Sequence, residues 1–574
     1  MRARSLIFGI TMSQPVGAPD DEIESVYEHA YKPIARIAYA NPKLFLTLHI
    51  SGNLLEWLEK NHPEFLDVLS EMSSRKQIEL LGGGYYNPVF PLIPRADRIG
   101  QIERLTTTVR KRFGRRPRGC WVTEFVWEPS LPSTLNTAGM EYVFLDDFLF
   151  RKGGLEDTEC RRPVLTEDQG KTLVVFPVSR DLRSALKHSD ESAFTQGFSE
   201  YQPEDLGCVF FEGRCFADVD LEGLCQRLLS DDSIQLTHPW RVLRDTPVRR
   251  RAYFPSTSYE EMMLWTLTPD QGQRVRETLR KAGGRSEWIA GGFFRHFLTR
   301  YAEANLLYSK MQYVHVLVNQ IRGDKYRRQA AREELWRGQA HNAYWHGRPG
   351  GLYQSNLRKA AYSALIEAEK VTREKGIFIP SIVPVDFDMD GLEEYLFQGQ
   401  TLNAYVHRIG ACMFELDYLP SAWNYLDTMS RHGEVYLDSG EPLDTSLRRA
   451  FQDRFFSRQL TASEMTANNL SPLASFVDAD FDIVDLDRDH HMVQLARTER
   501  IGEVEVSLNK TFYFRDTQIE ARYILRNDGG GSLRGVFATE INLSFPGEQS
   551  YALRYKDAAG KLVAQDGHDE SIEQ

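Results

Sequence analysis

The sequence contains 574 residues, of which 42% are hydrophobic, and it carries a net charge of −12. A chain of this length predicts several domains with a large buried core. The acidic balance provides no basic field for a phosphate backbone, so nucleic acid is excluded as an expected partner. No apolar run approaches the roughly 20 residues that span a bilayer, so we expect a soluble protein with no membrane partner.

The first ten residues, MRARSLIFGI, begin like a signal peptide. Their apolar run is short, however, and TMSQP follows it in place of a cleavage site, so we interpret the segment as a buried first strand. Six cysteines are scattered without a CxxC pair, which predicts neither a zinc site nor a disulfide framework. These features predict a cytoplasmic protein, and the lack of a metal-like His/Cys cluster predicts no catalytic metal and no cofactor.

From residue 1 to about residue 290, short apolar runs alternate with longer segments of helical spacing. The runs that we interpret as buried strands are SLIFGI, KLFLTLHI, IELLGGGYY, GCWVTEFVW, YVFLDDFLF, TLVVFPV and GCVFFEG. Alternation of strand and helix predicts a parallel sheet, and about seven repeats predict a closed or nearly closed (β/α) barrel. In such a barrel the chemistry lies at the C-terminal ends of the strands.

Two further regions follow the predicted barrel. Residues 291–380 show consecutive helical patterns and predict a helical subdomain that packs on the barrel. Residues 381–574 contain short alternating runs with turn residues, which predict a C-terminal β-sandwich; NDGGG at 527–531 is interpreted as a hairpin signal. The polar tail from residue 565 is expected to fray.

The segment RGCWVTEFVWEPSL places two glutamates among large apolar residues. If it is a strand, Glu124 shares an inward face with Cys120 and Val122 near the strand's end, whereas Glu128 belongs to the exit loop. Burying a carboxylate is costly unless it is paired or used. Glu124 is therefore either a catalytic group or one partner of a buried ion pair. Glu128 is expected to have a structural use, such as capping or pairing with a basic side chain.

A second carboxylate, Glu212, ends the apolar run CVFFE just before Gly213. Glycine allows a sharp turn there, so the carboxylate can project into a site. Two carboxylates at the ends of different strands are what glycoside hydrolysis requires, and Asp146 and Asp147 add acidic groups on another strand. The sequence therefore predicts an enzyme that acts on sugars, with Glu124 and Glu212 as its catalytic pair.

Sugar binding also needs stacking faces and hydrogen-bonding groups. Aromatic side chains of these types are as consistent with core packing as with sugar contact, and packing is the more common use. The candidates are Tyr85, Tyr86, Trp127, Tyr344 and Trp345, with His49, His341 and His346 as further polar lining.

Many ordered blocks of this sequence resemble glycoside hydrolase family 57, in the branch of 4-α-glucanotransferases and α-amylases. The blocks include HISGNLLEWL, ELLGGGYYNPVFPLIP, WVTEFVWEP, PSTSYEEMMLW and LWRGQAHNAYWHGRPGGLY, and they cover nearly the whole chain. The resemblance implies a distorted seven-stranded barrel, a helical region and a β-rich C-terminal domain. It also implies a retaining mechanism on an α-glucan or maltooligosaccharide substrate, with Glu124 as the nucleophile and Glu212 at the position of the catalytic aspartate.

The resemblance adds expectations about binding and assembly. Together with the residue types discussed above, it leads us to predict substrate binding by Gln14, His49, Trp127, Asp147, Tyr344, Trp345 and His346. The oligomeric state stays open, with a homodimer as the hypothesis that the resemblance offers.

Several positions depart from the family pattern. Thr11 and Ser13 stand where the family has two histidines before Gln-Pro, and Asn87 stands where it has a glutamate. Leu149 replaces a histidine, and Phe125 replaces an arginine beside the nucleophile. Two hypotheses therefore remain: an enzyme with an altered active site, or a catalytically weak or inactive relative that binds glucan or a protein partner.

Overall fold

The computed structural model describes residues 3–188, 191–282, 292–347, 350–373, 376–436, 443–461, 464, 470–545, 552–556 and 562–566. The chain divides into two compact units, which are described separately. The first unit contains Met1–Ala304 and Arg332–Ala361, and the second contains Asn305–Ala331 and Tyr362–Gln574. None of the helices in the described ranges is long and apolar enough to cross a membrane.

The first unit alternates strands and helices, as the sequence predicts. Its strands are β1 (Arg4–Met12), β2 (Leu46–Ile50), β3 (Ile78–Leu81), β4 (Gly119–Cys120), β5 (Tyr142–Asp146), β6 (Val164–Asp168), β7 (Lys171–Val178), β8 (Leu206–Glu212), β9 (Ile234–Leu236), β10 (His346–Gly347) and β11 (Gly350–Gly351). Its helices are α1 (Asp20–Val26), α2 (Lys32–Ala40), α3 (Gly52–Asn61), α4 (Pro63–Ser74), α5 (Arg95–Phe113), α6 (Leu131–Thr137), α7 (Asp147–Lys152), α8 (Arg180–Lys187), α9 (Glu191–Ser199), α10 (Leu221–Ser230), α11 (Pro239–Asp245), α12 (Glu260–Trp265), α13 (Pro269–Lys281) and α14 (His296–Arg300).

Two sheets organise the first unit. One has the order β3-β2-β1-β8 and the other has the order β4-β5-β7-β6. A parallel bridge between Gly82 and Cys120 joins the end of β3 to β4. On the other side, the N–H group of Ser179, just after β7, donates to the Cys208 carbonyl in β8 at 2.8 Å. The parallel strands therefore form a continuous hydrogen-bonded path through β1, β2, β3, β4, β5, β7 and β8.

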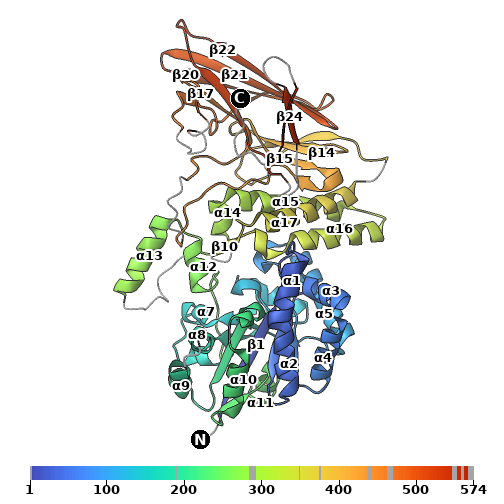
Figure 1. The fold of residues 1–574 in the computed structure, drawn as a ribbon, viewed down its shortest axis with the longest axis vertical. Coiled ribbons are helices and arrows are strands. Elements are labelled where there is room, and N and C mark those ends of the chain that lie inside the picture. The colour runs from blue at the N-terminus through green and yellow to red at the C-terminus, as the bar shows by residue number, and fades with distance from the viewer. Residues whose placement is uncertain are drawn as a thin grey trace. The chain divides into compact units, whose positions relative to one another are not determined.

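Burial explains why the strand sequences are apolar. In β1 every residue from Leu6 to Met12 is buried, because parallel strands covered on both faces require near-continuous hydrophobic runs. Figure 1 shows helices such as α2, α8 and α10 around β1. The predicted first strand is confirmed, and six of the seven predicted runs contain a strand of appreciable length.

The exception is the segment GCWVTEFVW, for which the predicted strand is wrong beyond Cys120. Only Gly119–Cys120 forms β4, and Thr123–Phe125 forms a short 3-10 turn. Glu124 and Phe125 have φ angles of 52° and 50°. Strand residues need strongly negative φ, so alternating faces cannot extend through this turn. The inward direction of Glu124 must therefore be explained by the turn and its partners.

The predicted helices between residues 291 and 380 are confirmed. They are α15 (Ala302–Gln320), α16 (Lys325–Gly338) and α17 (Ser355–Thr372). Their apolar side chains recur at helical spacing, and Ala331, Leu335 and Leu365 are among those that are buried.

The second unit is rich in antiparallel strands. They are β12 (Ser381–Val385), β13 (Glu394–Gln398), β14 (Leu402–His407), β15 (Cys412–Tyr418), β16 (Trp423–Asn424), β17 (Ala450–Phe456), β18 (Ala474–Ser475), β19 (Asp482–Asp487), β20 (Met492–Ile501), β21 (Val504–Arg515), β22 (Gln518–Asn527), β23 (Val536–Ile541), β24 (Ala552–Lys556) and β25 (Leu562–Asp566). One sheet follows β12-β13-β14-β15-β17-β18 and another follows β19-β20-β21-β22. Side chains of both sheets, including Phe397 of β13 and Phe512 of β21, share one hydrophobic cluster.

The hairpin prediction for the second unit is confirmed in part. Strands β21 and β22 pair in register from Val506 opposite Asn527 to Arg515 opposite Gln518. The segment NDGGG does not close a hairpin, because β23 beyond it pairs with β17 instead of β22. Most of the tail, from residue 567 onward, lies outside the described residues. The protein is a multidomain α/β protein with a β-rich C-terminal region.

Candidate active site

The turn that carries Glu124 lies between β4 and α6. Consecutive left-handed φ angles at two non-glycine residues cost of order 1–3 kcal/mol each and persist only where the surroundings hold them. In this protein residues 257–259 hold the turn in place. Trp127 N–H donates to the Thr257 carbonyl at 2.9 Å, Thr257 N–H returns a bond to Trp127 at 3.2 Å, and Ser258 Oγ donates to the Glu124 carbonyl.

The carboxyl group of Glu124 has a fixed position. Its Oε2 accepts a hydrogen bond of 3.0 Å from the Tyr259 hydroxyl, and its Oε1 lies 3.7 Å from His341 Nε2. The side chain is 28% exposed. Burial raises the pKa of Glu124 to about 7, and the charge of Glu212 contributes to the increase, whereas the Tyr259 hydrogen bond and the charge of Arg214 lower it.

His341 presents an unprotonated nitrogen to Glu124. Its Nδ1 donates to the Asn87 carbonyl at 2.8 Å, which places the proton of the neutral ring on Nδ1. The amide of Asn342 donates to Nε2 at 3.3 Å, in agreement with this tautomer. Burial lowers the pKa of His341 to about 4, so the ring is neutral at pH 7 and does not form an ion pair with Glu124.

Asn87 connects this imidazole to a second one. Its Oδ1 accepts a hydrogen bond of 2.9 Å from His49 Nε2, while its carbonyl binds His341. Asn87 has a φ of 49°, a left-handed conformation that asparagine tolerates better than most residues. His49 is fully buried, and burial lowers its pKa to about 4. The residue that departs from the family glutamate therefore orients two neutral histidines.

Glu212 lies at the last position of β8, opposite Thr11 of β1. Its Oε1 lies 3.1 Å from the Arg214 guanidinium, and its side chain is 53% exposed. A Cβ atom at Gly213 would approach the Tyr31 ring to 2.9 Å, which explains why glycine follows the carboxylate. The charge of Glu212 raises the pKa of Glu124, so this carboxylate acts on the proposed nucleophile.

The two aspartates after β5 are buried and engaged. The Asp146 carboxylate accepts from the Phe148 N–H group at 3.0 Å and caps α7. Asp147 pairs with Arg151 through two contacts of 3.4 and 3.2 Å. Burial raises the pKa of both aspartates, and the Asp147 charge raises that of Asp146 further. Asp147, expected to bind substrate, is thus half of a buried ion pair.

Three aromatic residues expected to contact sugar pack inside the protein instead. Trp127 is 1% exposed and meets the Phe254 ring edge to face. Tyr344 is buried and donates its hydroxyl to the Gly338 carbonyl at 2.6 Å. Trp345 stacks on Trp265 with ring centroids 6.1 Å apart. Sugar stacking needs an open ring face, and these three side chains are buried, so their substrate-binding role stays a prediction.

The remaining expected contact residues are also buried. Gln14 donates to the Tyr31 hydroxyl at 3.2 Å, and His346 meets the Phe297 and Tyr301 rings edge to face. The phenol of Tyr85 donates to Glu56 at 2.8 Å.

Glu128 pairs with a basic side chain, as the sequence predicts. Arg295 Nε lies 2.8 Å from Glu128 Oε1, and the same guanidinium donates to the Pro91 carbonyl. This ion pair ties the exit loop to the segment before α14. Glu128 therefore serves in an ion pair, whereas Glu124, four residues earlier, is the candidate catalytic group.

The two apolar side chains that depart from the family pattern pack in the interior of the protein. Leu149 is fully buried in the hydrophobic cluster that also contains Trp127, and Phe125 packs edge to face on Trp121 with ring centroids 5.1 Å apart. Thr11 Oγ1 donates to the Phe211 carbonyl at 3.4 Å, and the Ser13 carbonyl accepts from the Tyr31 hydroxyl at 3.1 Å.

Sequence reasoning missed Tyr259, Ser258 and Arg214. The first two belong to the block PSTSYEEMMLW, but tyrosine and serine at those positions carry no pattern that distinguishes a catalytic neighbour from an ordinary buried residue. Arg214 follows Glu212 by two residues, a spacing that could have identified it as the partner of that carboxylate.

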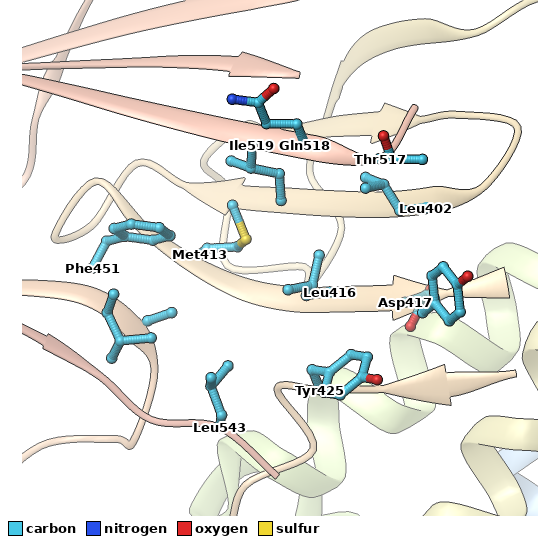
Figure 2. A pocket seen from close by; sticks show the side chains of 13 residues that line it. Leu402, Met413, Leu416, Asp417, Tyr425, Phe451, Thr517, Gln518, Ile519 and Leu543 are labelled. Atoms are coloured by element: carbon cyan, nitrogen blue, oxygen red, sulfur yellow. The ribbon is translucent and has the colours of Figure 1, made fainter. Parts of the chain in front are cut away.

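A pocket of about 360 Å³ lies in the second unit (Figure 2). Its lining is mainly apolar, including Leu402, Met413, Leu416 and Phe451. Among the described residues that line it, Asp417 alone is charged, and that carboxylate binds Lys310 at 2.7 Å. The pocket therefore contains no free pair of carboxylates and is not the candidate catalytic centre.

Three family models match successive parts of this chain. Residues 17–206 match the model of glycosyl hydrolase family 57. Residues 292–372 match the alpha-amylase/4-alpha-glucanotransferase middle domain, and residues 386–440 and 442–573 match the C-terminal domain of the same proteins.

Relatives of known name extend the match. Alpha-amylase 1 of Dictyoglomus thermophilum is 35% identical over 450 residues, which are 75% of this chain and 65% of that protein. The 4-alpha-glucanotransferase of Thermococcus litoralis is 31% identical over 458 residues, 76% of this chain and 67% of that protein. The crystal structure of the latter superposes with a TM-score of 0.87 at 28% identity, covering 97% of this chain and 90% of that one. This chain belongs to glycosyl hydrolase family 57.

Proposed function

We propose that this protein acts on α-1,4-linked glucose chains as a retaining enzyme of the 4-α-glucanotransferase or α-amylase type. The proposal rests on one observation above all. Glu212 ends β8 and Glu124 follows β4, two strands of the same parallel path, and the charge of one carboxyl alters the pKa of the other. Relatives named alpha-amylase and 4-alpha-glucanotransferase supply the substrate class.

In the proposed mechanism Glu124 attacks the anomeric carbon and forms a glycosyl ester. The glycosidic bond breaks, and its oxygen leaves with the proton of Glu212. Glu212 then takes a proton from water or from a sugar hydroxyl, whose oxygen displaces Glu124 from the anomeric carbon. Water gives hydrolysis, and a sugar gives transfer.

The raised pKa of Glu124 favours its protonated form, whereas the proposed first step needs this carboxyl group ionised. A proton on Glu212 removes the charge that raises the pKa of Glu124, so protonating the acid favours ionisation of the nucleophile. The reactive form is therefore the one with a proton on Glu212 and a charge on Glu124. Tyr259 and Arg214 stabilise that charge.

The architecture forms part of the proposal. We interpret the parallel path of the first unit as a distorted seven-stranded (β/α) barrel spanning residues 1–290, followed by a helical region at 291–380. The shared hydrophobic cluster of the two antiparallel sheets supports a β-sandwich at 381–574. The cytoplasmic location and the homodimer stay predictions.

Incubation with maltooligosaccharides, followed by chromatography of the products, tests the function. Chains both longer and shorter than the substrate indicate transfer, and shorter chains alone indicate hydrolysis. The Glu124→Gln variant is the control. Measurable glucan binding without any product would contradict the proposal and favour the inactive relative, in which Leu149 and Phe125 replace polar groups.

A further inference from the structure

The sequence DFDMDGLEE places aspartates at positions 386, 388 and 390, directly before Gly391. This spacing is typical of the first half of calcium-binding loops, in which side-chain oxygens at alternate positions face one ion. The glutamate that ends an EF-hand loop is absent, since position 397 is phenylalanine. Glu394, three residues after the glycine, is the nearer carboxylate.

The loop between β12 and β13 gathers these groups beside the end of β14. Asp388, Asp390, Glu394 and His407 each contribute an atom, and these four atoms lie within 4.8 Å of one another. Three carboxylates at this distance repel one another unless a positive charge lies between them.

Glu394 provides a second, independent observation. Its side chain is fully buried, with an exposed fraction of 0%. The Phe387 N–H group donates to Oε2 at 2.7 Å, whereas Oε1 has no hydrogen-bond partner among the described residues. Oδ1 of Asp388 is likewise buried without such a partner in the described part of the chain. Leaving a buried carboxylate oxygen unsatisfied costs several kcal/mol or forces it to take up a proton.

His407 does not supply the balancing charge. The Ile409 N–H group donates to its Nδ1 at 2.9 Å, so the proton of the neutral ring is on Nε2. Nε2 lies 3.3 Å from Asp388 and 3.6 Å from both Asp390 and Glu394. A nitrogen that carries a proton cannot coordinate a metal. Nε2 orients Asp388 instead, and the remaining donors are all oxygen atoms.

We infer that Asp388, Asp390 and Glu394 form a calcium site that is separate in sequence from the catalytic carboxylates. An oxygen-only set of flexible carboxylates suits calcium, whereas zinc prefers imidazole and thiolate ligands. The ion occupies the space between the three carboxylates and satisfies the Glu394 oxygen. It stabilises the second unit by joining the β12–β13 loop to β13.

Calorimetry on the full chain, treated with a chelator and then titrated with CaCl₂ or MgCl₂, tests the inference. We expect one Ca²⁺ ion per chain, weaker binding of Mg²⁺, and an unfolding midpoint that rises with the Ca²⁺ concentration. Asp390→Asn should weaken Ca²⁺ binding by about tenfold or more, since even loss of a group that only supports a ligand costs about that much. The Asp390 side chain is 38% exposed, so this variant should fold.

Glu393→Gln is the matched control, because it removes an exposed carboxylate from the position next to Glu394. It should bind Ca²⁺ as the wild type does. Absence of Ca²⁺ binding by the wild type would overturn the inference. Equal losses of Ca²⁺ affinity in Asp390→Asn and Glu393→Gln would also overturn it, since that result indicates attraction to a negative surface without specific ligands. Tighter binding of Zn²⁺ than of Ca²⁺ would contradict the oxygen-only site.

Discussion

The Tyr259 hydroxyl donates a hydrogen bond of 3.0 Å to Oε2 of Glu124, across a separation of 135 residues in the chain. The preceding residue, Ser258, binds the Glu124 carbonyl, so one short segment holds both the backbone and the carboxyl group of the proposed nucleophile. Reacting groups need positions fixed to within about 0.5 Å. The left-handed turn at Glu124 is thus stabilised where catalysis requires a rigid carboxylate.

Tyr259→Phe should slow the enzyme and change its pH dependence. In the wild type the Tyr259 hydrogen bond lowers the pKa of Glu124. Its loss raises that pKa and moves the acid limb of the kcat/KM profile to higher pH. We expect kcat/KM at pH 7 to fall by about tenfold, as for loss of one hydrogen bond to a charged group. Tyr253→Phe, at a tyrosine that is 54% exposed, is the control. Superimposable profiles for wild type and Tyr259→Phe would refute the positioning role.

Glu212→Gln should shift the same limb in the opposite direction. Glu124 attacks when ionised, so with a pKa of about 7 the wild-type rate of glycosylation rises with pH through neutrality and then levels off. Removing the Glu212 charge lowers the pKa of Glu124 and extends the fast region to lower pH. A substrate with an activated leaving group makes the measurement possible, because it needs no proton from residue 212. An acid limb that stays in place or moves to higher pH would show that the Glu212 charge does not raise the pKa of Glu124.

The two glutamates of the exit segment should differ sharply. Glu124→Gln removes the nucleophile and should lower kcat by at least about a thousandfold. Glu128→Gln breaks only the partly exposed pair with Arg295, which should cost about 1 kcal/mol of stability or less and leave turnover nearly intact. Steady-state kinetics and thermal unfolding of both variants provide the comparison. Equal losses of turnover would show that the assignment of the nucleophile is wrong.

The sequence predicts the strands and the strand-end position of Glu212 well because the physical causes are local. Each parallel strand needs a buried apolar run, and the run CVFFE ends visibly at Glu212 and Gly213. The conformation at Glu124 is different. Its residues have strand-like composition, yet a left-handed turn held by a distant segment overrides the alternation.

The burial of the expected binding residues could not be predicted from the sequence. Trp127 and Tyr344 are aromatic residues beside a candidate site, and residue type alone does not separate a stacking platform from a core side chain. The link from His49 through Asn87 to His341 includes a hydrogen bond between residues 254 positions apart, which a single sequence cannot reveal.

A buried lysine should dominate the stability of the second unit. Lys310 Nζ lies 2.9 Å from Glu369, 2.7 Å from Glu415 and 2.7 Å from Asp417. Lys310→Met keeps the volume but leaves the carboxylates without their cation, which should cost about 3–5 kcal/mol in denaturant-induced unfolding. Lys32→Met, at an exposed pair with Glu28, should cost less than about 1 kcal/mol. Similar costs for the two variants would show that the buried cluster contributes little.

Intact-mass analysis after incubation with an activated fluoro-glucoside tests the central claim most directly, because a retaining enzyme forms an ester with its nucleophile. We predict a sugar adduct that maps, after peptic digestion, to the peptide containing Glu124, and no adduct in Glu124→Gln. An adduct on the peptide containing Glu212 would reverse the two roles. Unmodified protein, together with no products from maltooligosaccharides, would contradict the enzyme and identify the chain as an inactive member of its family.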